Sequence, residues 1–127
     1  MDLDVLPGRF ALCRLPVSAA IPPWTEAARR FLTVSRTADE LSIVADAEVV
    51  PAGDAVRGDF RALRVRGPLP LEAVGILAAL TVPLAQVGIA VFAIATHDTD
   101  YLFVREPDFA RSMAVLEAAG HHVGNSP

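Results

Sequence analysis

Cysteine, long apolar runs and excess positive charge are all scarce in this sequence of 127 residues. A single cysteine, Cys13, excludes a disulfide within the chain and makes a reducing cytoplasm the expected location. The longest apolar run, near Ile89, is far shorter than the roughly 20 residues that cross a bilayer, so no membrane association is expected. Asp2 and Asp4 stand where a signal peptide would carry basic residues, and we therefore expect none.

Charge and composition narrow the functional classes further. A formal net charge of −4 argues against nucleic-acid binding, which needs a basic surface to replace phosphate counterions. With 53% hydrophobic and 20% charged residues, the chain is expected to fold and not to stay disordered. Its length allows one compact domain or two very small ones.

The most informative stretch runs from Leu71 to Arg105. Its first part predicts a helix whose apolar face repeats every three or four residues, at Val74, Leu77, Leu80, Leu84 and Val87. Gly88 is expected to end this helix. Pro83 is expected to kink or break it near Thr81–Pro83, because proline lacks the backbone donor and clashes one turn back.

A buried strand, a polar turn and a second strand follow the helix. The unbroken apolar run Ile89–Ala95 is rich in β-branched residues, which predicts a central strand with little access to water. The polar residues from Thr96 to Asp100 then form the tip of a hairpin, and Tyr101–Arg105 forms its second strand. A polar tip on a rigid support is a favourable place for binding groups.

The flanking segments complete a β-α-β-β-α-β order over residues 60–123. Phe60–Arg66 alternates apolar and basic residues, as a strand with one solvated face does. Pro107 begins a last helix that ends near Gly120, and residues 121–123 predict a short final strand. This order is ferredoxin-like, with two helices on one face of an antiparallel sheet, so the predicted fold class is α+β.

The first part of the chain looks like a reduced copy of the same plan. Strands are predicted at Arg9–Leu15, Phe31–Thr37 and Leu41–Ala45, with one or two helical turns between Ile21 and Arg30 and a surface loop at Pro51–Asp59. Because a full second helix is missing there, we predict two ferredoxin-like subdomains: a shortened one at residues 1–58 and a complete one at residues 59–127.

Two stretches of the second half, Gly75–Leu80 and Pro83–Glu106, resemble small bacterial proteins built from tandem ACT domains, which are similar to the CASTOR family of animal cytosolic arginine sensors. Arg9–Leu15, Trp24 and Phe31–Val44 resemble the first, shorter ACT unit. The resemblance implies a regulatory protein that is not an enzyme, needs no cofactor and binds an amino acid at an interface between ACT units. Because the chain is half as long as the animal sensor, it also implies a homodimer.

The resemblance further implies which residues contact the ligand, namely the helix start after the unit's first strand and the end of its second strand. By motif, these positions are Glu72, Ala73, Val74, Gly75, Ile76, Thr96, His97 and Asp100. His97 stands where related sequences often carry an aromatic residue, so the identity of the ligand stays open.

The chemistry of these residues suits a zwitterion. Free N–H groups at a helix start can bind a carboxylate, and Gly75 lets the backbone approach closely. Asp100 or Glu72 can accept hydrogen bonds from an ammonium group, and with Asp98 they form an acidic rim that favours a ligand with a positive group. Each residue also has a structural explanation, because acids stabilise the first turn of a helix and aspartates favour turns.

Other chemistries have less support in the sequence. His121 and His122 are adjacent, so on a strand they point to opposite faces and cannot easily share a metal. Cys13 lies among apolar residues and is predicted to be a small buried side chain, not a nucleophile. Two alternatives stay open: a protein-interaction module without a ligand, and a small enzyme on a ferredoxin-like scaffold, which would need a nucleophile–base pair or a metal set.

Overall fold

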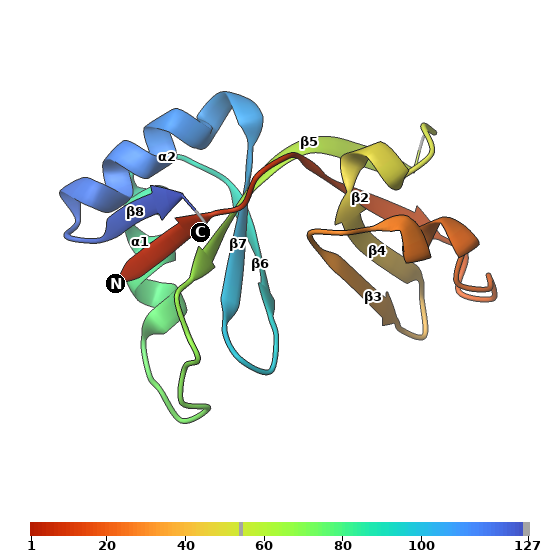
Figure 1. Ribbon diagram of the computed structural model, residues 1–127, viewed down its shortest axis with the longest axis horizontal. Coiled ribbons are helices and arrows are strands. Elements are labelled where there is room, and N and C mark those ends of the chain that lie inside the picture. The colour runs from red at the N-terminus through yellow and green to blue at the C-terminus, as the bar shows by residue number, and fades with distance from the viewer. Residues whose placement is uncertain (54, 126–127) are drawn as a thin grey trace. The chain divides into compact units, whose positions relative to one another are not determined.

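The computed structural model describes residues 1–53 and 55–125. It divides the chain into two compact units (Figure 1). The smaller unit is Gly8–Phe60, and the larger unit combines Met1–Pro7 with the residues from Arg61 onward. The division after Phe60 lies close to the predicted boundary at 58/59, but Met1–Pro7 were predicted to belong to the first unit and instead pack with the larger one. Among the described residues, no helix is long and apolar enough to span a membrane.

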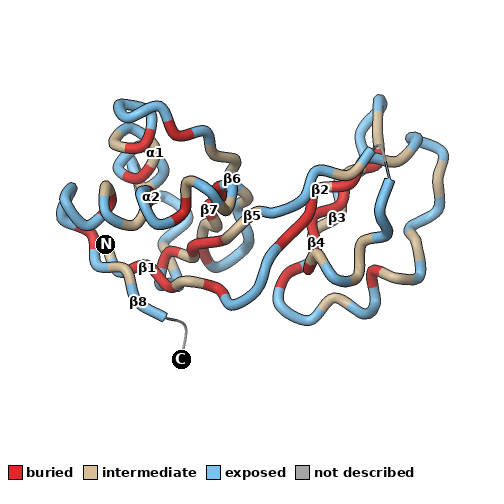
Figure 2. Tube along the Cα trace, turned by 90° about the horizontal axis from the view of Figure 1, so that it is seen from above, coloured by how far each residue is buried: buried red, intermediate tan, exposed pale blue. Residues whose placement is uncertain are grey.

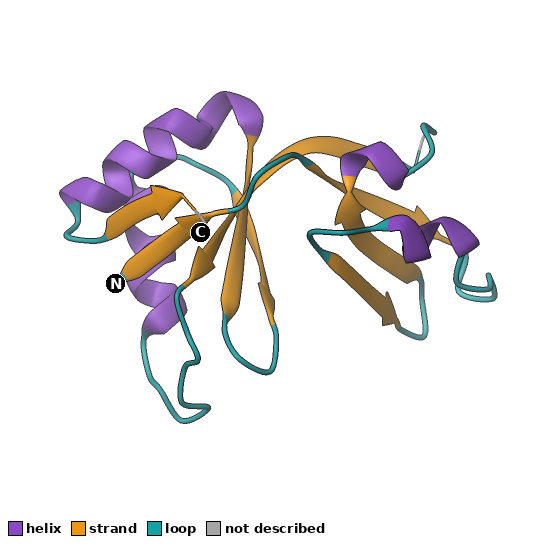
Figure 3. Ribbon diagram, viewed as in Figure 1, coloured by secondary structure: helices purple, strands orange, loops and turns teal. Residues whose placement is uncertain are grey.

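The smaller unit is an antiparallel sheet with two short 3-10 helices (Figure 3). Its strands in spatial order are β3 (Leu32–Arg36), β4 (Leu41–Asp46), β2 (Phe10–Leu15) and the first part of β5 (Val56–Val65). The 3-10 helices are η1 (Pro23–Ala27) and η2 (Ala47–Val49). The predicted strands and helical turns are confirmed here. The predicted loop at 51–59 is wrong at its end, because β5 already begins at Val56 and pairs with β2.

The larger unit has the predicted β-α-β-β-α-β order. Its elements are the end of β5, α1 (Ile76–Gln86), β6 (Val91–Ala95), β7 (Asp100–Arg105), α2 (Glu106–Ala118) and β8 (His122–Asn125). A further strand, β1 (Asp2–Val5), was not predicted. It lies between β5 and β8, antiparallel to the first and parallel to the second, which gives the sheet order β6-β7-β5-β1-β8. The α+β class is therefore confirmed, with a mixed sheet in place of a purely antiparallel one.

Both helices cover the same face of this sheet, and the core of the larger unit lies between them and the strands (Figure 2). The buried side chains come from β1, β5, α1, β7 and α2, and include Leu3, Leu63, Val65, Leu80, Leu84, Leu102, Val104, Phe109 and Leu116. Successive residues of a strand point to opposite faces, so the intervening side chains of β1, β5 and β7 point away from the helices. This alternation decides which charged groups remain available on the outer face.

The helix α1 starts later than predicted. Residues 71–75 form a turn, and Gly75 precedes the helix with φ of 83°, in the left-handed region that favours glycine. Leu71 and Val74 are 97% and 94% exposed, so they do not belong to the buried face, which Leu80 and Leu84 form. The strand β6 also differs from prediction, because it lies at the sheet edge and is only partly buried.

Pro83 neither breaks nor ends α1, which runs from Ile76 to Gln86 without interruption. Proline has no N–H, so the Ala79 carbonyl one turn earlier has no helical donor. His121 replaces that donor: its Nε2 lies 3.2 Å from the Ala79 oxygen, while its Nδ1 lies 3.0 Å from the Met1 nitrogen. His121 is buried, so this side chain compensates for the proline inside the larger unit.

We expect His121→Leu to lower the free energy of unfolding by about 1–2 kcal/mol, because it leaves the Ala79 carbonyl without a donor. In a Pro83→Ala background the same change should cost clearly less, because alanine supplies the missing N–H to Ala79. Urea unfolding of the two single variants and the double variant measures this coupling. An equal cost of His121→Leu in both backgrounds would contradict the explanation.

Candidate functional site

The turn between β6 and β7 is the most strongly polar part of the predicted site. Ala95 and Asp100 form the last pair of the two strands. Inside the turn, the Thr96 N–H donates to the Thr99 carbonyl at 2.9 Å, and the Thr96 hydroxyl donates to the same carbonyl at 3.0 Å. These local bonds close the turn and hold residues 96–99 in one conformation.

The loop that follows β5 is held against this turn. The Leu69 N–H donates to the Asp98 carbonyl at 2.7 Å, and the buried Thr99 hydroxyl donates to the Val65 carbonyl at 2.5 Å. Gly67 allows the contact, because a Cβ there would lie only 3.0 Å from the Asp98 oxygen. The loop and the turn, distant in sequence, are therefore fixed side by side.

Between the loop and the turn is a pocket of about 120 Å³. It is lined by Leu69, Pro70, Leu71, Ala73, Ala95, Thr96, His97, Asp98, Thr99 and Asp100. Four of the predicted site residues are among them: Ala73, Thr96, His97 and Asp100. Sequence reasoning missed the contribution of residues 69–71, because Pro68 and Pro70 indicated only a connection between strand and helix. The signal that could have included them is Gly67, which permits the close approach to the turn.

The other four predicted residues are not among those that line this pocket. Glu72 and Val74 are exposed in the turn before α1, and Gly75 occupies the position just before the helix. Ile76 is the first residue of α1 and packs against the core of the larger unit. In the part of the chain that the structure describes, no side chain caps the start of α1, and a Cβ at Gly75 would meet nothing within 4 Å.

The ionisable side chains around the pocket are mainly acidic, and one of them is hydrogen-bonded to a neighbouring histidine. His97 is fully exposed, and its Nδ1 lies 2.8 Å from Oδ1 of Asp98, so part of the hydrogen-bonding capacity of Asp98 is used locally. Asp100 is half-buried at the start of β7, and Glu72 is exposed. This arrangement provides carboxylate acceptors near a pocket wall, as a positively charged group of a ligand would require.

The described residues contain no cluster of three or more metal-ligating side chains. His121 is buried and His122 exposed, in agreement with their predicted opposite directions. Cys13 is buried, and burial raises the pKa of its thiol, which disfavours the reactive thiolate.

Comparisons with known proteins agree with the fold. Residues 55–118 match the model of an ACT domain family, and residues 8–53 match a family model for an N-terminal domain. A solved structure from Agobacterium tumefaciens is 32% identical, with 99% of this chain and 94% of that chain covered and a TM-score of 0.87. No curated protein matches the sequence.

More distant structures share the fold alone. A Vibrio cholerae protein of unknown function, described as a possible transport protein, is 22% identical over 90% of this chain and 85% of its own, with a TM-score of 0.72. The aspartate kinase of Clostridium acetobutylicum, described as an allosteric enzyme, is 10% identical over 92% of this chain and 33% of its own, with a TM-score of 0.64. Because the ACT domain model matches residues 55–118, which is half of the sequence, the chain belongs to the ACT domain family.

Proposed function

We propose that this chain is a non-catalytic regulatory protein that binds an amino acid between the loop at residues 69–76 and the turn at residues 96–100. The observation that carries the proposal is the pocket shared by these two segments, in which Ala73, Thr96, His97 and Asp100 meet. The likeness to an aspartate kinase described as allosteric supports a regulatory role for this fold. A cytoplasmic location, as in the CASTOR family, remains part of the proposal.

The proposed binding mode divides a zwitterion between two kinds of partner. Its carboxylate accepts hydrogen bonds from the N–H groups of Ile76, Leu77 and Ala78 at the open start of α1, where the helix dipole also favours negative charge. Its ammonium group donates to Asp100 or Glu72. A Cβ at Gly75 would meet nothing within 4 Å, so the space beside this residue is free for the approach.

A homodimer is the proposed assembly. Leu71 and Val74, beside the pocket, are 97% and 94% exposed, which is costly for large apolar side chains unless another surface covers them. If a second copy covers them at the pocket, ligand binding and association are coupled, and each favours the other. Such coupling would allow a change in amino-acid concentration to alter the assembly.

The proposal predicts that one or a few of the twenty amino acids raise the melting temperature of the protein, because a ligand that binds only the folded state stabilises it. Asp100→Ala should remove this stabilisation with little change in the melting temperature of the free protein. Glu117→Ala, which removes an exposed acid from α2, is the matched control and should keep the full response.

Calorimetry and light scattering complete the test. Heat of binding with a preferred amino acid, together with a change in molecular mass, would support a ligand-coupled dimer. No heat with any of the twenty, and no melting shift, would reject amino-acid binding and favour a protein-interaction module. A response that Asp100→Ala and Glu117→Ala reduce equally would remove Asp100 from the site.

A further inference from the structure

A second group of charged residues lies on the outer face of the larger unit's sheet, which points away from the helices. On β5, Leu63 and Val65 belong to the helix-covered core, so Arg64 between them points outward. On β1, Leu3 belongs to the same core, so its neighbour Asp4 also points outward. Asp4 and Arg64 are direct partners across the two strands.

Asp4 holds two guanidinium groups together. Its Oδ2 accepts a hydrogen bond from Nη2 of Arg64 at 2.8 Å, and its Oδ1 accepts from Nη2 and Nε of Arg66 at 2.6 and 3.2 Å. The Asp4 side chain is only 1% exposed, whereas those of Arg64 and Arg66 are 34% and 54% exposed. The carboxylate is thus enclosed, while its two partners reach the surface.

The charges in this group do not cancel, because two guanidinium groups share one enclosed carboxylate. Asp2 also approaches Arg66, at 3.8 Å, but both side chains are half exposed, so solvent weakens this pair. Each guanidinium has several N–H donors, and Asp4 engages one nitrogen of Arg64 and two of Arg66. Tyr101 also hydrogen-bonds the side chain of Arg64, and the exposed Asp98 lines the same pocket as both arginines. Asp4, Arg64 and Arg66 together still carry one net positive charge, and the exposed parts of both guanidinium groups reach solvent.

The two arginines line a pocket of about 280 Å³ with Gly67, Pro68, Thr96, Asp98, Thr99 and Tyr101. The wall formed by the β6–β7 turn is preformed, because bonds from Leu69 to Asp98 and from Thr99 to Val65 fix it. The hydrogen bonds to Asp4 fix the arginine wall in the same way. The volume is close to the lower end of the range for small-molecule pockets.

We propose that Arg64 and Arg66 bind the carboxylate group of a small organic acid in this pocket. A planar carboxylate matches the fork of N–H donors on a guanidinium group. One negative charge balances the excess charge of the group, whereas a phosphate with nearly two charges would be repelled more strongly by Asp98. Asp98 borders both pockets, but the groups that would bind the ligand differ, namely Arg64 and Arg66 here and Asp100 or Glu72 there, so either proposal can fail without the other.

The test is an NMR titration of ¹⁵N-labelled protein with sodium propionate, a monocarboxylate without an ammonium group. Ionic strength is kept constant with sodium chloride, and the Nε–H signals of Arg64 and Arg66 are followed. We expect the chemical shifts of these signals to change and to saturate as propionate is added.

Arg66→Gln and Arg66→Lys should each weaken propionate binding by about tenfold or more, because both remove the fork of donors. The backbone amide spectrum shows whether each variant is folded. If Arg66→Gln is unfolded, the propionate affinity of Arg66→Lys tests the proposal.

Arg57→Gln is the matched control, because it removes an exposed arginine of the smaller unit with the same change in charge. Propionate binding that survives this change but not the Arg66 changes supports the site. Shifts that do not saturate, or an equal loss in all three variants, would overturn it. Tighter binding of inorganic phosphate than of propionate would overturn the assignment to a carboxylate.

Discussion

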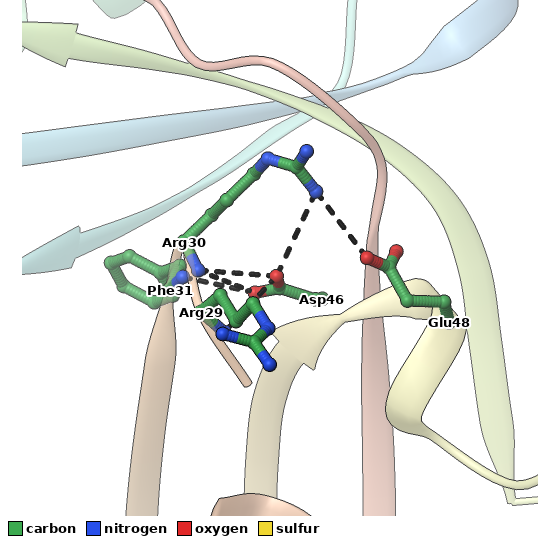
Figure 4. A network of polar contacts seen from close by, with 5 residues as sticks. All are labelled: Arg29, Arg30, Phe31, Asp46 and Glu48. Carbon is green, nitrogen blue, oxygen red and sulfur yellow. Dashed lines mark hydrogen bonds and ion pairs between the residues drawn. The ribbon is translucent and has the colours of Figure 1, made fainter. Parts of the chain in front are cut away.

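Asp46→Ala is expected to destabilise the smaller unit by about 3 kcal/mol, the largest effect that we predict for any single substitution in this chain. Asp46 is 1% exposed, and its carboxylate accepts hydrogen bonds from the backbone N–H groups of Arg29, Arg30 and Phe31 at 3.0–3.2 Å (Figure 4). These residues connect η1 to β3, so the carboxylate satisfies donors that neither element can satisfy. Alanine would leave these donors without a partner, and the Phe31 N–H is buried while those of Arg29 and Arg30 are partly buried.

Two further variants identify the cause of the loss. Asp46→Asn keeps one acceptor oxygen without the charge and should cost less than alanine. Asp39→Ala removes an exposed aspartate of the β3–β4 turn and should change the free energy of unfolding by less than about 0.5 kcal/mol. Urea unfolding gives the energies, and hydrogen exchange should accelerate at the amides of residues 29–31. Equal losses for Asp46→Ala and Asp39→Ala would show that the carboxylate is not a structural partner of this segment.

The order of elements in the larger unit could be predicted because the signals are local. The alternation around Leu63 and Val65, and the helical spacing of Phe109 and Leu116, depend only on neighbouring residues. The edge position of β6 could not be predicted in this way, since an apolar run does not indicate how many strands pair with it.

The strand β1 was missed because aspartate is rare in strands. Asp2 and Asp4 alternate with Leu3 and Val5, which is a strand pattern, but their acidic side chains disfavour a strand in an isolated segment. The reason that Asp4 is tolerated lies in Arg64, its partner across the sheet and distant in sequence. A single segment cannot reveal such a pair.

The pocket beside the β6–β7 turn could be predicted in part. Polar residues after an apolar strand indicated the turn itself, whereas the contribution of the loop depends on the long-range bond between Leu69 and Asp98. The start of α1 was placed too early because Val74 continues the apolar spacing of the helix. The positive φ of Gly75, which separates Val74 from the helix, is a backbone property that spacing does not contain.

The second large effect concerns Asp4 and acid. Hydrogen bonds from Arg66 and Arg64 hold the pKa of Asp4 below its usual value. A carboxyl group whose pKa is lower in the folded state stabilises the fold fully above its unfolded pKa of about 3.9 and loses this contribution as the pH falls through the folded pKa. Acidification below about pH 5 should therefore remove the contribution of Asp4 progressively.

Asp4→Asn is expected to cost about 2 kcal/mol at pH 7, because two arginines then face a neutral acceptor. The difference from the unchanged protein should shrink as the pH is lowered, since Asp4 itself becomes protonated. Urea unfolding at pH 7, 5, 4 and 3 measures this difference, and other carboxyl groups cancel because both proteins contain them.

Asp2→Asn is the matched control, because Asp2 is half exposed and lies 3.8 Å from Arg66. Its effect should stay below about 0.5 kcal/mol and disappear in high salt, which screens exposed pairs but not the enclosed Asp4. A cost for Asp4→Asn that stays constant from pH 7 to pH 3 would mean that packing, and not charge, makes Asp4 important. A cost that shrinks would instead establish Asp4 as the group that keeps both arginines in place on the outer face of the sheet.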